Sequence, residues 1–95
     1  MQLSVELTLS PLQDNFEPTI KDFIKNLRAS GFTVKETPLS TQIYGEYQSL
    51  MNFLTTAIQE AFENEKAVVL QMKLFKGDRS SYVPMFHFIH IYSSF

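Results

Sequence analysis

The sequence predicts an α+β domain in which two helices cover one face of a four-stranded antiparallel sheet. Four segments alternate apolar and polar residues with the period of a half-buried strand, and two others repeat apolar residues at helical spacing. Their order along the chain is strand, helix, strand, strand, helix, strand. This order is typical of the split βαβ, or ferredoxin-like, arrangement.

Length and composition restrict the classes of protein that the chain can belong to. Its 95 residues, 44% of them hydrophobic and 19% charged, suit one globular domain. A net charge of −2 does not favour nucleic-acid binding, and the lack of cysteine excludes disulfides and thiol catalysis. No segment resembles a signal peptide, and no apolar run approaches the roughly 20 residues of a membrane helix. The expectation is therefore a soluble cytoplasmic protein without a membrane partner.

The first strand and the first helix are clear in the pattern. Residues 3–9 alternate, and the strand ends at Ser10-Pro11 because proline cannot donate a hydrogen bond to a neighbouring strand. A helix is expected to begin near Glu17, with Pro18 in its first turn, and to end before Gly31. Its apolar stripe consists of Ile20, Phe23, Ile24 and Leu27.

A hairpin is expected next. Residues 32–36 alternate, Pro38 ends that strand, and a Pro-Leu-Ser turn leads into a strand at residues 41–47. Ile43 is the apolar member of this strand, so its side faces the core. Gly45 lies on the same side, where the missing side chain is expected to leave room for a helix to pack closely.

The last helix and the last strand complete the order. Residues 48–64 carry a broad apolar helical stripe, and residues 67–75 alternate again before a charged turn at residues 76–79. The opposite, open face of the sheet is predicted to carry polar side chains, and such an amphipathic face is often covered by a second subunit. Its predicted members are Ser4, Glu6, Thr8, Lys35, Gln42, Tyr44, Gln71 and Lys73.

The C-terminal residues do not fit this unit. The domain is expected to occupy residues 1–79. Residues 80–95, SSYVPMFHFIHIYSSF, form an aromatic tail that we interpret either as an oligomer contact or as a tail without a fixed place on the domain. His87 and His90 invite a metal interpretation, but a spacing of three puts them on opposite faces of a strand. No metal site is therefore predicted.

Three stretches resemble the YkoF-like thiamine-binding protein family. They are the first strand ending in LSPL, the hairpin GFTVKETPLSTQIYGEY running directly into a helix, and the last strand VVLQMKLFKGDR. The resemblance extends from Ser4 to Asp78. There are two departures: Tyr44 stands where members commonly have an acidic residue, and the aromatic tail stands where they tend to have a short polar helix.

The resemblance implies a non-enzymatic binding protein for thiamine or its hydroxymethylpyrimidine part, without a cofactor, acting as a homodimer or homotetramer. Thiamine combines a thiazolium cation with an aminopyrimidine, so a carboxylate, an aromatic ring and a few hydroxyl or amide groups would suit it. The candidates for such a site, on or near the open face, are Glu6, Ser40, Thr41, Tyr44, Glu46 and Gln71.

Other functions compete with this one. An acylphosphatase of the same fold needs an arginine and a glycine in the first loop, and SPLQDNFEP has neither. An RNA-recognition domain needs stacking aromatic residues on its central strands and a basic surface, which the sequence lacks. No catalytic motif is present. The remaining alternative is a structural or regulatory oligomer without a small-molecule ligand.

Overall fold

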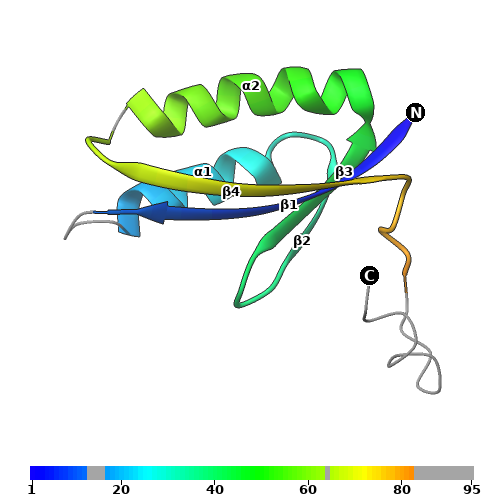
Figure 1. Cartoon of the computed structure of the whole chain (residues 1–95), viewed down its shortest axis with the longest axis horizontal. Helices are drawn as coiled ribbons and strands as arrows, with labels where there is room; N and C mark the ends of the chain where they lie inside the picture. The colour runs from blue at the N-terminus through cyan, green and yellow to red at the C-terminus, as the bar shows by residue number, and fades with distance from the viewer. Residues whose placement is uncertain (13–16, 64, 83–95) are drawn as a thin grey trace.

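The computed structural model describes residues 1–12, 17–63 and 65–82. The sheet has the strand order β2-β3-β1-β4, with every neighbouring pair antiparallel, and both helices lie on the same face of it (Figure 1). The predicted ferredoxin-like fold is therefore confirmed. In chain order the elements are β1 (Gln2–Pro11), α1 (Glu17–Arg28), β2 (Thr33–Glu36), β3 (Thr41–Glu46), α2 (Tyr47–Glu63) and β4 (Val68–Lys76).

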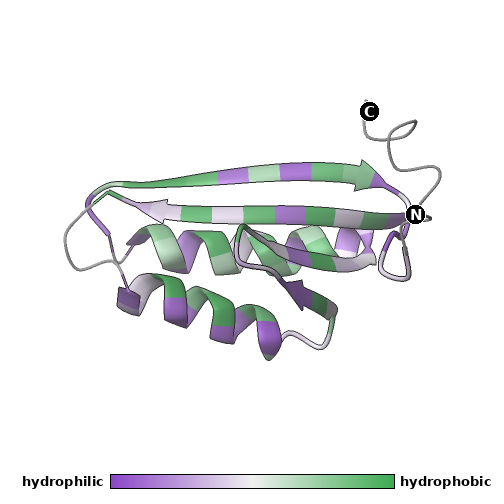
Figure 2. Ribbon diagram, turned by 90° about the horizontal axis from the view of Figure 1, so that it is seen from below, coloured by the Kyte–Doolittle hydropathy of each residue, from purple (hydrophilic) through white to green (hydrophobic). Residues whose placement is uncertain are grey.

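Strand β1 lies at the centre of the sheet and is paired along both edges. Leu3, Val5 and Leu7 point toward the helices and are at most 4% exposed. Across the sheet they face Gly45, Ile43 and Thr41 of β3 on one side and Lys76, Leu74 and Met72 of β4 on the other. The alternation of hydrophobic and hydrophilic residues along the two long strands is visible in Figure 2. The period-two pattern thus decides which side chains face the helices.

The core lies between the sheet and the two helices. Each helix presents one apolar stripe to it, as helical spacing requires. From α1 come Phe23 and Leu27, and α2 contributes Leu50, Leu54, Ala57 and Ala61. Neither α1 nor α2, the two helices of the described residues, is long and apolar enough to cross a membrane.

Gly45 packs against a ring, and this corrects the expectation that it makes room for a helix. A Cβ atom added to Gly45 would lie 2.5 Å from Cδ1 of Phe32, a residue of the connection between α1 and β2. The Phe32 ring in turn packs against Phe53 of α2, with ring centroids 5.8 Å apart. The glycine therefore lets an aromatic side chain cover β3 and join it to α2.

The predicted hairpin turn connects β2 to β3. The Thr37 amide donates to the Ser40 carbonyl at 2.9 Å, and the Thr37 hydroxyl accepts from the Ser40 amide at 3.1 Å. The turn thereby fixes Ser40 beside the start of β3. Of the predicted tail, only residues 80–82 are described, so its expected role as an oligomer contact lies outside the described residues, as do His87 and His90.

Candidate functional site

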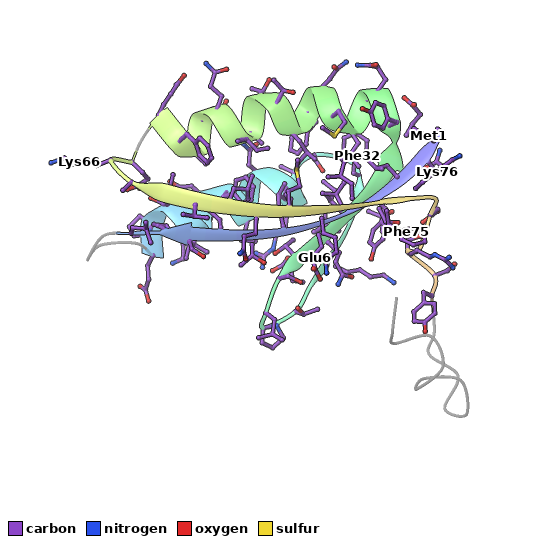
Figure 3. All side chains as sticks on the ribbon, in the orientation of Figure 1. Met1, Glu6, Phe32, Lys66, Phe75 and Lys76 are labelled. Atoms are coloured by element: carbon purple, nitrogen blue, oxygen red, sulfur yellow. The ribbon has the colours of Figure 1, made fainter. Side chains whose placement is uncertain are left out.

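The face of the sheet that points away from the helices carries the candidate site. Because Leu3, Val5 and Leu7 face the core, Ser4 and Glu6 of β1 point the other way. The register places Ser4 opposite Tyr44 of β3, and Glu6 opposite both Gln42 of β3 and Lys73 of β4. Figure 3 shows Glu6 and Phe75 on this side of the sheet, away from α2.

A pocket of about 730 Å³ lies on this open face. Its volume is within the range of known small-molecule sites. All four strands contribute to its lining, together with the chain that follows β4. The lining residues are Ser4, Val5, Glu6, Lys35, Gln42, Tyr44, Lys73, Phe75, Arg79 and Tyr82.

Ser4 fastens the chain after β4 to the edge of the pocket. Its hydroxyl donates to the Gly77 carbonyl at 2.8 Å and accepts from the Arg79 amide at 2.9 Å. Gly77 has a φ of 117°, a conformation that is open to glycine and that side chains rarely adopt. The chain can therefore turn at Gly77 and carry Arg79 over the sheet.

Tyr44 forms the floor of the pocket and is only 8% exposed. Its hydroxyl donates to Oε1 of Gln42 at 2.8 Å, and the Lys35 ammonium lies 5.9 Å from its ring centroid. Burial raises the pKa of Tyr44 above its usual value, and the negative charges of Asp78 and Glu6 raise it further. The phenol therefore stays neutral at physiological pH and offers an uncharged aromatic surface.

The Glu6 carboxylate is held from two sides. The Ser40 hydroxyl donates to its Oε2 at 3.0 Å, and the Lys73 ammonium lies 3.8 Å from its Oε1. Both partners come from neighbouring segments, the hairpin turn and β4. The carboxylate is thus oriented in the pocket by its surroundings.

The other charges of the pocket lie toward its C-terminal edge. Lys35 donates to the Ser80 carbonyl, and the Arg79 guanidinium lies 4.6 Å from the centroid of the Phe75 ring. Hydrogen bonds from Ser80 hold the pKa of Asp78 below its usual value, and the nearby charge of Lys35 lowers it further. The segment after β4 is therefore ordered by contacts with the sheet.

The structure brings together three of the six residues predicted to bind a ligand. Glu6 and Tyr44 line the pocket, and Ser40 holds Glu6 from behind. Gln71 lies on the same face but opposite Thr8, farther along the strands, and it does not line the pocket.

The other two predicted residues lie elsewhere. Thr41 was expected on or near the open face, but it is opposite Leu7, on the side covered by the helices, and is 6% exposed. The Glu46 carboxylate accepts from the amides of Gln48 and Ser49 at 3.0 and 3.1 Å, so it caps the N-terminus of α2. These hydrogen bonds lower the pKa of Glu46.

Sequence reasoning missed several lining residues as site residues. Lys35, Gln42 and Lys73 were assigned to the open face, because alternation places them there, but were not proposed to bind. Phe75 continues the alternation of Gln71 and Lys73, so the pattern contained the information needed to place it. Arg79 and Tyr82 follow the last strand, and no sequence pattern reveals the turn that places them over the open face of the sheet.

A second hollow of about 520 Å³ lies between the two helices. Asp22 and Glu60 are among its lining residues, and the Asn26 amide donates to Glu60 at 3.1 Å. In the part of the chain that the structure describes, no three His, Asp or Glu side chains gather as a metal ion would require. The open-face pocket is therefore the stronger candidate for a ligand site.

Comparison with known families and structures gives further information. The profile of a family described as thiamine-binding protein matches residues 5–82. A protein from Streptococcus pneumoniae is 27% identical, with a TM-score of 0.76, over 86% of this chain and 93% of that chain. A comparison with curated proteins found no significant match.

Two more distant structures share the fold. A protein from Thermotoga maritima, provisionally assigned to thiamine biosynthesis or salvage, is 16% identical with a TM-score of 0.73, over 97% of this chain and 99% of that chain. A domain of unknown function from Bacillus cereus is 18% identical with a TM-score of 0.65, over 97% and 90% of the two chains.

Proposed function

The chain belongs to the thiamine-binding protein family. From this premise we propose that it binds thiamine or its hydroxymethylpyrimidine part in the open-face pocket. We propose that it does so without catalysing a reaction. The observation that carries the proposal is the meeting of an oriented carboxylate and two aromatic rings in one pocket: Glu6, Tyr44 and Phe75. The family description, which names binding rather than a reaction, supports a role without chemistry.

The chemistry of the pocket suits the two rings of thiamine. The aminopyrimidine carries an exocyclic amine that can donate to a carboxylate such as Glu6. Its ring nitrogens can accept from Gln42, whose Oε1 is already used by Tyr44, so that Nε2 is the atom left to donate. The rings of Tyr44 and Phe75 offer faces on which a planar heterocycle can stack, and such stacking adds roughly 0.5–1.5 kcal/mol.

Titration calorimetry with thiamine and with hydroxymethylpyrimidine tests the proposal. We expect Glu6→Gln to weaken binding about five- to a hundredfold, because it disrupts a hydrogen bond worth about 1–3 kcal/mol. Tyr44→Ala should weaken binding about two- to tenfold, because it removes stacking worth roughly 0.5–1.5 kcal/mol. Thr41→Val is the matched control, since Thr41 lies on the opposite face, and it should leave affinity unchanged. If the wild-type protein gives no heat with either compound at millimolar concentration, it does not bind this ligand class.

We further propose that the protein acts as a homodimer or homotetramer in which the open face is covered by a second copy. Phe75 and Val69 of β4 are 48% and 44% exposed on this face, and Tyr82 at its edge is 57% exposed. Phe75 and Tyr82 both line the pocket, whereas Val69 lies near the other end of β4, opposite Ser10. Exposed apolar side chains are thus spread along this face, and such a surface favours a protein contact. The alternative function, a structural or regulatory oligomer without a ligand, predicts the same assembly. The oligomeric state therefore cannot distinguish the two functions, whereas the calorimetric titration can.

A further inference from the structure

The charges that line the open-face pocket do not balance. Three cationic side chains line it, Lys35, Lys73 and Arg79, against one carboxylate, Glu6. Asp78 lies just outside the lining, close enough to act on Tyr44 and Lys35. Even with Asp78 included, three positive charges face two negative ones, so the surroundings of a ligand carry an excess of positive charge.

Two of the three cations are available to a ligand. Lys73 is 3.8 Å from Glu6, so its charge is largely matched. Lys35 donates to the Ser80 carbonyl and lies over the Tyr44 ring, with Asp78 near enough to be affected by its charge, and Arg79 lies over the Phe75 ring. Among the described residues, neither Lys35 nor Arg79 forms a salt bridge with a carboxylate. The unmatched positive charge therefore lies on the side of the pocket formed by β2 and the chain after β4.

The Arg79 backbone is fixed before any ligand arrives. The two hydrogen bonds of Ser4, to the Gly77 carbonyl and from the Arg79 amide, join this segment to the central strand. A guanidinium carried by an ordered backbone loses less freedom on binding than one on a free loop. Its planar set of donors can grip two oxygens of a phosphate at once.

A bare thiazolium cation is poorly suited to an excess of positive charge. A phosphate ester of the same compound carries about −1.5 to −2 charges on the phosphate at neutral pH. We infer that the pocket takes the phosphorylated form of its ligand, thiamine monophosphate or the corresponding pyrimidine phosphate, with Arg79 and Lys35 holding the phosphate. This inference rests on the proposed function, and it names the ligand form within that class.

Calorimetry on the full chain with thiamine and with thiamine monophosphate tests the inference. We expect the monophosphate to bind at least about tenfold more tightly, since charge-assisted hydrogen bonds to a phosphate are stronger than neutral ones. This advantage should shrink as salt is added, because ions screen the attraction. Inorganic phosphate at millimolar concentration should compete with the monophosphate and leave thiamine binding unchanged.

Single substitutions test which residues cause the tighter binding of the monophosphate. Arg79→Gln and Lys35→Gln should each weaken binding of the monophosphate about tenfold or more, whereas thiamine, a cation, should bind as tightly as before or more tightly once a positive charge is removed. Lys76→Gln is the matched control: it removes the same charge from a residue near Phe75 whose side chain lies on the other face of the sheet (Figure 3).

The possible results separate the inference from the proposed function. Thiamine binding that equals or exceeds monophosphate binding would overturn the inference and leave the proposed function in place. An equal loss of both ligands in Arg79→Gln and Lys35→Gln would likewise remove the phosphate role from these residues. Heat with neither compound would overturn both proposals.

Discussion

At the scale of single residues, Ser4 is predicted to hold the chain after β4 against the sheet. It is 8% exposed and serves both the Gly77 carbonyl and the Arg79 amide. Ser4→Ala should lower the free energy of unfolding by about 1–3 kcal/mol, because both backbone groups lose their partner. Hydrogen exchange should also become faster at the Arg79 amide while the amides of β1 stay protected. An unchanged exchange rate at Arg79 would mean that other contacts hold this segment.

Gly45 supports a second residue-scale prediction. Its replacement by alanine places a methyl group 2.5 Å from the Phe32 ring, so the ring must shift and its packing against Phe53 is disturbed. Gly45→Ala should cost about 1–3 kcal/mol of stability in urea unfolding, as overpacking does. In a Phe32→Ala background the same substitution should cost clearly less, because the ring that it collides with is gone. Equal costs in both backgrounds would show that the ring does not cause the effect.

The sequence could predict only part of the candidate site at this scale. Tyr44 and Glu6 follow from alternation and from the chemistry of a heteroaromatic cation. Thr41 was chosen because it follows the turn. It lies two positions before the core-facing Ile43, however, and residues two apart on a strand share a face, so the alternation already placed Thr41 on the core side. Arg79 depends on a turn at Gly77 and on a hydrogen bond to a residue 75 positions away, and local sequence patterns do not encode such a contact.

At the scale of an element, the N-terminus of α2 depends on Glu46. Its carboxylate accepts two backbone amide hydrogen bonds, which lower its pKa. A lowered pKa in the folded state means that the stabilisation is present above the unfolded value and is lost as the pH falls through the folded value. Glu46→Gln should therefore lower the melting temperature at pH 7, and the difference from wild type should disappear in acid, well below pH 4.5.

The control for this prediction is at the other end of the same helix. Glu63 is the last residue of α2, where a negative charge opposes the helix dipole. Glu63→Gln should leave the melting temperature unchanged or raise it at pH 7. A loss of stability in both variants would indicate a general charge effect and would remove the special role of Glu46.

Most elements could be predicted because their patterns are strongly periodic. The first helix was expected near Glu17 and begins there, and the second differs from the expected range of 48–64 by one residue at each end. Strand β1 is longer than the expected range of 3–9, since Gln2 and Pro11 still pair, whereas β4 has the expected length and is shifted by one residue, from 67–75 to 68–76. Pairing at strand ends depends on the neighbouring strand, so the alternation of one strand does not determine its length.

At the scale of the whole molecule, light scattering should detect a homodimer or homotetramer across a hundredfold range of concentration. The apolar side chains on the open face carry this prediction. Val69→Asp should shift the protein toward monomer, because it places a charge on this face outside the ligand pocket. Asn52→Asp, on the exposed side of α2, adds the same charge and should leave the mass unchanged. Monomer alone at every wild-type concentration would contradict the proposed assembly.

The central position of β1 also determines how the molecule can reach its folded state. The β2–β3 hairpin joins neighbouring residues and can form early, whereas Ser4 meets Gly77 across 73 positions of sequence. Contacts between distant residues slow folding, because the chain must close a long loop before they form. During synthesis, β1 therefore leaves the ribosome with both edges unpaired. One edge can pair once β3 has been made, and the other stays open until β4 has been made.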